Sequence, residues 1–398
     1  MTGTGGGLRP SVVVVSRRRP ECLARCLAAL ARQSRGLELV LVADPEAVGL
    51  RPDLPIKRVS FDQANISAAR NAGLAQAAGD VVLFVDDDAI AGTEWVARMT
   101  AAFTDPRVIA ATGFTRGPDG LNWQSRAERI SASGRGYPIT PEQAALEPEG
   151  GDPVSTIGTN CAFRRSALLA IGGFDPAFSY HLDESDVNRR MARVFPQGLT
   201  AILPRAQVIH GLAAGTSRAG TGVPHDLRAI GRSTAIFAAR HGGDASWIVE
   251  AQRRRLLRLM VAGRLDPLAV GRILRSLREG LAEGAGHHAL PAPCAGVPPA
   301  YLELPPAPVA PLFLAGWHWR ARPLRAAAAR AVAQGGHVTL LLLTPTALPH
   351  RLKMAPGGWW EQRGGIWGPS QPGDSAFKLG AKRARIMREE SFFAALLR

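Results

Sequence analysis

The stretch DVVLFVDDDAI (residues 80–90) runs five apolar residues directly into three aspartates and then becomes apolar again. The apolar run at 81–85 is typical of a buried strand. Neighbouring carboxylates repel one another, so holding Asp86, Asp87 and Asp88 at the end of such a strand requires a compensating cation or hydrogen bonds. A hard divalent cation that also binds substrate phosphates suits this position. The alternative is a solvated acidic turn, which the flanking apolar residues disfavour.

The segments around this stretch alternate between strand and helix patterns. Strands are predicted at 11–15, 37–44, 55–61 and 81–85, and helices at 20–33 and 66–78. Strands separated by helices of roughly 10 to 15 residues indicate an α/β fold with a parallel sheet covered on both faces. Ligands bind such sheets beyond the carboxyl ends of the strands. Asp44 ends the second strand, so we expect it near Asp86, Asp87 and Asp88.

The length of 398 residues exceeds a usual single domain of roughly 100 to 200 residues, and four segments are predicted. They are a main domain at 8–220, a helical extension at 221–286, a proline-rich linker at 287–311 and a small α/β unit of unknown role at 312–398. Within them, 147–158 is expected to be an exposed loop, 164–171 a helix, and 265–280 an amphipathic helix with Asp266 as its N-cap.

The composition restricts the class of protein. No apolar stretch approaches the roughly 18 to 20 residues of a membrane helix, and the N-terminus lacks the pattern of a signal peptide, so we expect a cytoplasmic protein. Four scattered cysteines do not form a disulfide framework. The net charge of +15 suggests an anionic partner, although an arginine-rich codon bias explains it as well. Nucleic acid is disfavoured because the basic runs lack interleaved aromatic residues.

Three motifs in order resemble the family 2 glycosyltransferases, whose nucleotide-sugar-binding fold is called GT-A. They are SVVVVSRRRPECLARCLAALARQ (11–33), NISAARNAGLAQAAGDVVLFVDDDA (65–89) and GTNCAFRRSALLAIGGFDPAFSYHLDESDVNRRM (158–191), and the resemblance covers about residues 9–215. The resemblance implies transfer of a sugar from a nucleoside-diphosphate sugar, a UDP-sugar above others, to an acceptor hydroxyl. The implied acceptor is a glycan or lipid-linked glycan in cell-surface glycan synthesis, and the family's usual stereochemical course is inversion.

The same resemblance implies roles for individual residues. It places nucleotide-sugar binding at Ser16, Asp44, Arg70, Asn71, Asp86 and Asp87. It places Mn²⁺ or Mg²⁺ at Asp86, Asp88 and His210. The alternative for Arg70 and Asn71 is an ordinary polar helix face, and the alternative for His210 is a structural histidine.

Sugar transfer also requires a group that takes the proton of the acceptor hydroxyl, which a carboxylate can do. The stretch HLDESDVNRRM (181–191) supplies carboxylates at a helix start, and the resemblance places the base at Glu184, with Asp183 as the other choice. A purely structural alternative is that Asp183 caps the helix and Asp186 pairs with Arg190.

Two other enzyme classes compete with this interpretation. A phosphatase of the haloacid-dehalogenase type also has an Asp-x-Asp loop after a strand, but usually after the first strand of its domain. A sugar nucleotidyltransferase needs a glycine-rich loop after its first strand, where this chain has VVVVSRRRPE (12–21).

The helix at 265–280 raises a further possibility. Apolar residues lie along one side of it, while Arg272, Arg275 and Arg278 gather on another. An apolar face with a basic flank is typical of a helix that lies on an anionic membrane, here the inner membrane face. The alternative is that the apolar side packs against the rest of the protein and the arginines are solvated.

Overall fold

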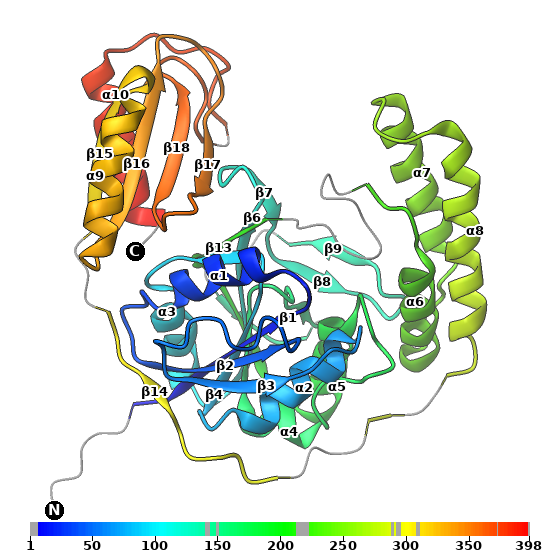
Figure 1. The fold of residues 1–398 in the computed structure, drawn as a ribbon. Helices are drawn as coiled ribbons and strands as arrows, with labels where there is room; N and C mark the ends of the chain where they lie inside the picture. The colour runs from blue at the N-terminus through cyan, green and yellow to red at the C-terminus, as the bar shows by residue number, and fades with distance from the viewer. Residues whose placement is uncertain are drawn as a thin grey trace, which may run out of the picture.

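The computed structural model describes residues 7–139, 144–148, 151–211, 223–287, 290–291, 296–307, 311–371 and 373–396. A mainly parallel central sheet runs in the order β10-β13-β6-β12-β4-β1-β2-β14 (Figure 1). Its strands are β1 (Pro10–Ser16), β2 (Leu37–Ala43), β4 (Val81–Asp86), β6 (Val108–Arg116), β10 (Ala144–Leu146), β12 (Cys161–Arg164), β13 (Leu199–His210) and β14 (Glu303–Leu304). Three more strands extend it: β3 (Ile56–Ser60) pairs with β2, β5 (Ala89–Ala91) with β13, and β7 (Trp123–Ser125) with β6.

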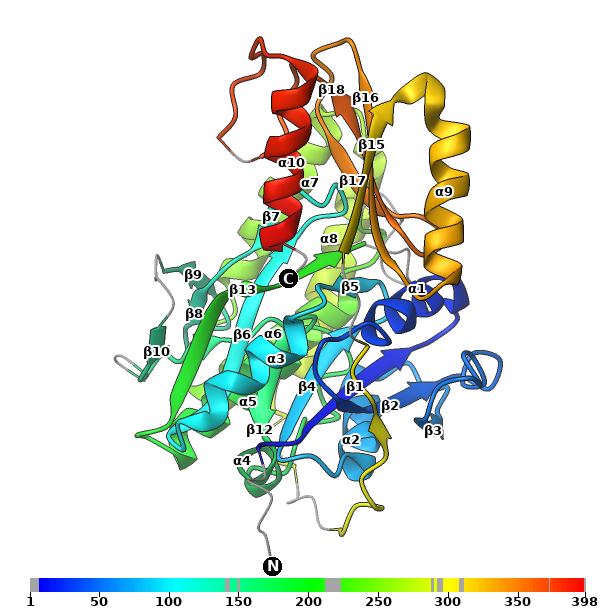
Figure 2. The ribbon, with the colours of Figure 1, turned by 90° about the vertical axis from the view of Figure 1, so that its left-hand side faces the viewer.

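Helices cover both faces of this sheet. Helices α1 (Pro20–Leu30) and α3 (Trp95–Ala101), the latter followed by a short 3₁₀ helix at Ala102–Thr104, lie on one face (Figure 2). Helices α2 (Ile66–Gln76), α4 (Arg165–Ala170) and α5 (Asp183–Val194) lie on the other. Alternate residues of a strand point to opposite faces, so Val12 and Val14 pack in the first layer and Val13 packs in the second. The predicted α/β sheet is confirmed.

The middle of the chain differs from the prediction. The segment 147–158 was expected to be an exposed loop, but Val154 and Ser155 are buried and form strand β11. This strand pairs with β8 (Glu128–Ile130), which pairs with β9 (Gly136–Pro138). The exposed-loop prediction is wrong because Val154 packs with Phe114, Ala127 and Ile202, residues far from it in the sequence.

Three further helices form a stack beside the main sheet: α6 (Arg228–His241), α7 (Trp247–Val261) and α8 (Pro267–Gly284) (Figure 1). The predicted start of α8 is confirmed, because the Asp266 carboxylate accepts a hydrogen bond of 2.9 Å from the backbone N–H of Leu268. Helix α8 packs closely on α6, since a Cβ added at Gly280 would lie only 1.9 Å from the carbonyl oxygen of Arg228.

The described residues from 311 to 396 form a second, smaller sheet, called here the C-terminal unit. Strands β15 (Pro311–Trp317), β16 (His337–Thr344) and β18 (Trp360–Gly365) are parallel, and β17 (Arg351–Met354) adds antiparallel to β18. Helices α9 (Ala321–Ala333), preceded by a 3₁₀ turn at His318–Arg320, and α10 (Lys382–Leu396) cover its two faces. The strand–helix–strand pattern over 312–346 is confirmed, whereas β17, β18 and α10 were not predicted.

The proline-rich segment predicted as a linker lies partly against the main sheet. Strand β14 pairs with β2, and the Tyr301 hydroxyl donates a hydrogen bond of 2.9 Å to the carbonyl of Pro10. The predicted boundaries of the four segments stay a prediction. Among the helices of the described ranges, none combines the length and the apolar character that a membrane span requires.

Candidate active site

The ends of β1, β2 and β4 meet at one edge of the sheet, as expected for parallel strands. The backbone N–H of Arg18 donates a hydrogen bond of 2.7 Å to the carboxylate of Asp44, and the Ser16 hydroxyl donates one of 2.7 Å to Asp87. Arg19 pairs with the other oxygen of Asp87 at 3.1 Å. The segment after β1 therefore connects Asp44 with the three aspartates.

The side chain of Asp87 is buried under this segment, and that of Asp88 is buried beside His210. Burial raises the pKa of Asp87 to about 6, although Arg19 and the hydrogen bond from Ser16 act in the opposite direction. Asp87 thus ties the ends of β1 and β4 together, while Asp86 is about one third exposed. Its predicted contact with the nucleotide sugar stays a prediction.

Asp86, Asp88 and His210 form a cluster of potential metal ligands. Strand β5 follows the aspartates and pairs antiparallel with β13, which sets Ala89 opposite His210. Nε2 of His210 lies 3.0 Å from a carboxylate oxygen of Asp88 and 3.9 Å from one of Asp86. One donor atom from each residue can be chosen so that all three lie within 4.8 Å of one another. Carboxylate oxygens with one imidazole nitrogen fit Mn²⁺ and, less fully, Mg²⁺.

Arg70 connects this cluster with the carboxylates of α5. Its buried guanidinium is hydrogen-bonded to Asp183, lies 3.3 Å from Asp86, and donates a bond of 3.0 Å to the carbonyl of Gly158. The ring of Phe174 flanks it at 5.3 Å. Burial alone would lower the pKa of Arg70, but the carboxylates around it raise the pKa above its ordinary value. Arg70 therefore stays charged between two acidic groups.

The start of α5 places Asp183 and Glu184 differently. His181 and Leu182 both have left-handed backbone angles, with φ of 73° and 63°, and Leu182 is the N-cap residue. The proposed capping role of Asp183 is wrong, because its side chain turns away from the helix end and pairs with Arg70. Strained angles of this kind occur where the surrounding structure holds a functional residue in place.

Glu184 is the more accessible of the two carboxylates, with its side chain 22% exposed against 5% for Asp183. Burial and the adjacent Asp183 charge raise the pKa of Glu184 well above its ordinary value, while Arg70 at 3.8 Å opposes the shift. A Cβ added at Gly158 would lie 2.9 Å from the Arg70 guanidinium and 3.2 Å from the Glu184 carboxylate, so the glycine allows both groups to approach the backbone closely. A raised pKa suits a residue that accepts a proton near neutral pH.

Asp186 has a structural role, as the alternative of pairing with Arg190 predicted. It pairs with Arg190 at 2.7 Å, as the spacing predicted, and also with Arg240 and His241 of α6 at 2.9 and 3.0 Å. These partners outweigh the effect of burial and lower the pKa of Asp186 to about 2. Asp186 fastens α5 to α6 behind the carboxylate pair.

Asn71 is not brought together with the other predicted binding residues. Its amide donates a hydrogen bond of 2.6 Å to the carbonyl of Phe174 and accepts one of 2.9 Å from the N–H of the same residue. Both polar atoms of the side chain therefore hold the 172–178 loop, which agrees with the alternative of a polar helix face.

Gln124 was missed by the sequence analysis. Its amide lies within hydrogen-bond distance of Nδ1 of His210, with 2.9 Å to Nε2 and 3.2 Å to Oε1 of the glutamine. No sequence motif marks Gln124, because only the pairing of β7 with β6 brings it beside the metal cluster.

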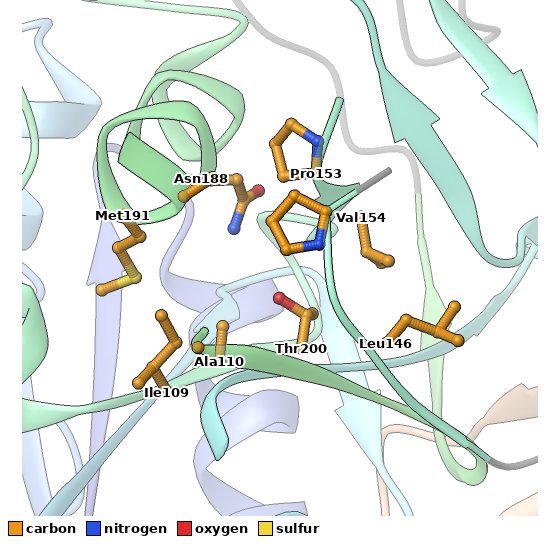
Figure 3. A pocket seen from close by; sticks show the side chains of 11 residues that line it. Ile109, Ala110, Leu146, Pro153, Val154, Asn188, Met191 and Thr200 are labelled. Atoms are coloured by element: carbon orange, nitrogen blue, oxygen red, sulfur yellow. The ribbon is translucent and has the colours of Figure 1, made fainter. Parts of the chain in front are cut away.

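A small pocket lies further along α5, between that helix and the strands β10, β11 and β13 (Figure 3). Its lining includes Ile109, Asn188 and Met191, and its volume is about 10 Å³, roughly that of one water molecule. None of its lining residues belongs to the carboxylate and metal clusters, so this pocket is too small and too remote to hold a nucleotide sugar.

The chain is similar to known glycosyltransferases in part of its sequence. Residues 11–172 match the family model described as Glycosyl transferase family 2. The succinoglycan biosynthesis protein ExoM of Rhizobium meliloti is 34% identical over 131 residues, which cover 29% of this chain and 42% of that protein. The N-acetylglucosaminyl-diphospho-decaprenol L-rhamnosyltransferase of Mycobacterium tuberculosis is 30% identical over 207 residues, which cover 48% of this chain and 64% of that protein.

Among solved structures, the mannosyltransferase PcManGT of Pyrobaculum calidifontis, in complex with GDP-Man and Mn²⁺, is similar at 20% identity. The match covers 72% of this chain and 78% of that one, with a TM-score of 0.42. The chain spans from 42% to 64% of the length of the two curated relatives named above.

Proposed function

Since residues 11–172 match the model of glycosyl transferase family 2, we propose that the chain transfers a sugar from a nucleoside-diphosphate sugar to an acceptor hydroxyl, in a metal-dependent reaction. The observation that carries the proposal is the position of Arg70 between two acidic groups, Asp86 of the metal cluster and the Asp183–Glu184 pair. A transferase needs both groups close together, because the leaving diphosphate and the acceptor hydroxyl react at the same carbon of the sugar.

The donor side of the proposed site is formed by the ends of β1, β2 and β4. Asp86, Asp88 and His210 would hold Mn²⁺ or Mg²⁺, which when bound supplies positive charge to the departing diphosphate. Ser16 and Asp44 lie at the ends of β1 and β2, on the side of Asp87 away from the metal cluster, which supports a role for them at the nucleoside end of the donor. We propose a UDP-sugar as the donor.

The acceptor side of the proposed site contains Glu184. Asp183 is held by Arg70, which leaves the more exposed Glu184 to take the proton of the attacking hydroxyl. One base acting on an acceptor opposite the leaving group leads to inversion at the sugar carbon. A positioned base contributes roughly 10²- to 10⁴-fold to the rate.

We further propose a lipid-linked glycan as the acceptor and the inner face of an anionic membrane as the place of action. The name of the Mycobacterium tuberculosis relative includes a diphospho-decaprenol compound. In addition, many arginines of the α7–α8 hairpin are exposed. Phosphate groups of a lipid carrier and of anionic lipids are both complementary to such a basic surface.

Replacement of Asp88 tests the metal role. The experiment measures thermal stabilisation by UDP and GDP and by their sugars, with and without Mn²⁺, in the wild type and in Asp88→Asn. We expect Mn²⁺-dependent stabilisation in the wild type and its loss in the variant, because one of the two metal-binding carboxylates is then neutral. Asp80→Asn, at the opposite end of the same strand region and hydrogen-bonded to Arg9, is the matched control. Undiminished binding by Asp88→Asn, or full activity in excess chelator, would contradict metal dependence.

A further inference from the structure

Gln124 faces Nδ1 of His210, and the C-terminal unit packs against the neighbouring residue Ile209. We infer that Gln124 is a positioning residue that fixes His210 as a metal ligand, and that the C-terminal unit holds in place the β6–β7 hairpin that carries Gln124. This inference rests on the metal-dependent function proposed above. It assigns a role to the C-terminal unit, which lies outside the family match at 11–172.

The tautomer of His210 determines whether its ring can bind a metal. Nε2 faces Asp88 and Asp86, so a metal there requires an unprotonated Nε2 and a proton on Nδ1. That Nδ1–H then needs an acceptor. The Gln124 amide faces Nδ1 with Nε2 at 2.9 Å and Oε1 at 3.2 Å, so a rotation of the amide presents Oε1 as the acceptor when a metal is bound. Partners of this kind orient metal-binding histidines and typically change metal affinity 10- to 100-fold when they are removed.

Gln124 is itself exposed and lies in β7, so its position depends on the hairpin formed by β6, β7 and the loop between them. Arg116 is buried beneath this loop, where it donates a hydrogen bond of 2.5 Å to the carbonyl of Leu121, and its guanidinium lies 4.0 Å from the centre of the Trp123 ring. The Asp119 carboxylate accepts hydrogen bonds from the N–H groups of Leu121 and Asn122. The loop is therefore ordered by contacts on both of its sides.

The C-terminal unit supplies the outer contacts of this loop. The N–H of Leu352 in β17 donates a hydrogen bond of 2.8 Å to the carbonyl of Asp119, and a Cβ at Gly120 would lie 2.6 Å from that of Leu352. Phe392 of α10 lies against Arg116 at 5.5 Å from ring centre to guanidinium. Figure 1 shows β17, an edge strand of the C-terminal unit, near β7 where the two sheets approach each other.

The same unit also packs directly behind the metal ligands. Leu352, Trp360 and Phe393 form one buried apolar cluster with Ile90 and Ile209. Ile209 precedes His210, and Ile90 lies two residues after Asp88. The cluster therefore packs against β5 and β13, the paired strands that bring these ligands together. Close-packed protein interiors transmit small displacements. A change in the packing of this cluster should therefore alter the positions of the metal ligands.

The first test compares Gln124→Leu with Gln124→Glu. Mn²⁺ affinity is measured by electron paramagnetic resonance titration, with Mn²⁺ alone and with Mn²⁺ plus UDP, and the thermal unfolding of each variant is recorded. We expect Gln124→Leu to bind Mn²⁺ about 10-fold more weakly or worse, and Gln124→Glu, which keeps the acceptor, to retain the wild-type affinity. Nitrogen-15 shifts of His210 in the protein saturated with diamagnetic Mg²⁺ should show a proton on Nδ1 in the wild type and a loss of this preference in Gln124→Leu.

The second test concerns the C-terminal unit. Leu352→Ala should weaken Mn²⁺ binding several-fold, whereas Leu341→Ala should not, because Leu341 packs in the same unit against α10 and away from the β6–β7 loop. Both leucines are almost completely buried, so the two variants lose similar packing.

The outcomes separate this inference from the proposed function. No Mn²⁺ binding by the wild-type protein would contradict the metal role and, with it, the role of Gln124. Binding by the wild type with equal affinity in Gln124→Leu would overturn the Gln124 inference alone. Equal effects of Leu352→Ala and Leu341→Ala would overturn the part that concerns the C-terminal unit.

Discussion

Arg70 lies where the donor and acceptor ends of the proposed site come closest. It contacts Asp86 on one side and Asp183 on the other, and the charge of its buried guanidinium is compensated by these carboxylates. This arrangement separates the functions of the two adjacent acids. Asp183 is fixed by a charge-assisted hydrogen bond, and Glu184 is left with a raised pKa and a partly exposed carboxylate.

Exchanging each acid for its amide tests this division. Glu184→Gln should leave donor binding intact and reduce turnover by roughly 10² to 10⁴, because the proton acceptor is lost while the shape is kept. The measurement is kcat and KM for the donor, together with donor binding by calorimetry. If Asp183→Asn shows this pattern instead, Asp183 is the base.

The pH profile gives a second prediction about the same pair. Glu184 must be deprotonated to act, so kcat/KM of the wild type should fall as the pH drops through its raised pKa. Asp183→Asn removes the adjacent negative charge and releases Arg70 toward Glu184, and both changes lower the pKa of Glu184. The acidic limb of the profile should therefore move to lower pH in Asp183→Asn. An unmoved limb would contradict the coupling of the two carboxylates.

At the scale of elements, the carboxylate pair depends on how α5 is fastened to α6. Asp186 is fully buried and meets Arg190 of its own helix and Arg240 and His241 of α6. Leu182, at the strained corner before Glu184, packs against Phe178 and Phe237, the second of which also belongs to α6. Helix α6 therefore supports the segment that presents Glu184.

Asp186→Asn should lower the free energy of unfolding by about 3 to 5 kcal/mol, because it leaves buried cations without their counter-charge. The pKa of Asp186 is depressed to about 2, so its stabilisation is complete above its ordinary pKa of about 3.9 and is lost as the pH falls toward 2. Urea denaturation at pH 7 and between pH 4 and 2 measures both effects. Asp244→Asn, in the exposed turn between α6 and α7, is the control and should change stability much less. Equal stability losses in the two variants would contradict the anchoring role.

At the scale of the whole molecule, the α7–α8 hairpin projects beside the main sheet (Figure 1). The apolar side of α8 is not available to a membrane, because Ile273, Leu274 and Leu277 are buried in the helix stack. This agrees with the packing alternative for that face. The end of the hairpin is different, since Val261 and Leu268 are more than 80% exposed there and residues 251–278 contain eight arginines and one acid, Asp266.

We therefore expect weak, salt-sensitive binding to anionic liposomes that involves the exposed arginines and the end of the hairpin. Replacing Arg272, Arg275 and Arg278 together with glutamine should reduce the binding, because each arginine near the surface contributes about 1 kcal/mol. Co-sedimentation with anionic and neutral liposomes at low and high salt is the measurement. The control removes the same charge from the C-terminal unit at Arg320, Arg322 and Arg330, which are also exposed. Equal recovery with both kinds of liposome, or an equal effect of the control, would favour a solvated hairpin without a membrane role.

The sequence by itself determined the first half of the sheet and the carboxylates at its edge. Strands β1 to β4 and helices α1 and α2 begin and end within one to three residues of their predicted bounds, because the apolar periodicity that forms each of them is local. The same local signals placed Asp44 and Asp86–Asp88 at strand ends, and parallel strands bring such ends to one edge of the sheet.

Only the tertiary structure decided which side chains meet. Asp88 and His210 are joined by the pairing of β5 with β13, and Arg70 reaches Asp183 across 113 positions of the chain. Gln124 lies beside His210 because β7 pairs with β6, and the sequence of β7 shows no strand periodicity. The apolar side of α8 packs against the neighbouring helices and is not available to a membrane. Such contacts depend on the packing of distant segments, which the spacing of residues along one segment does not contain.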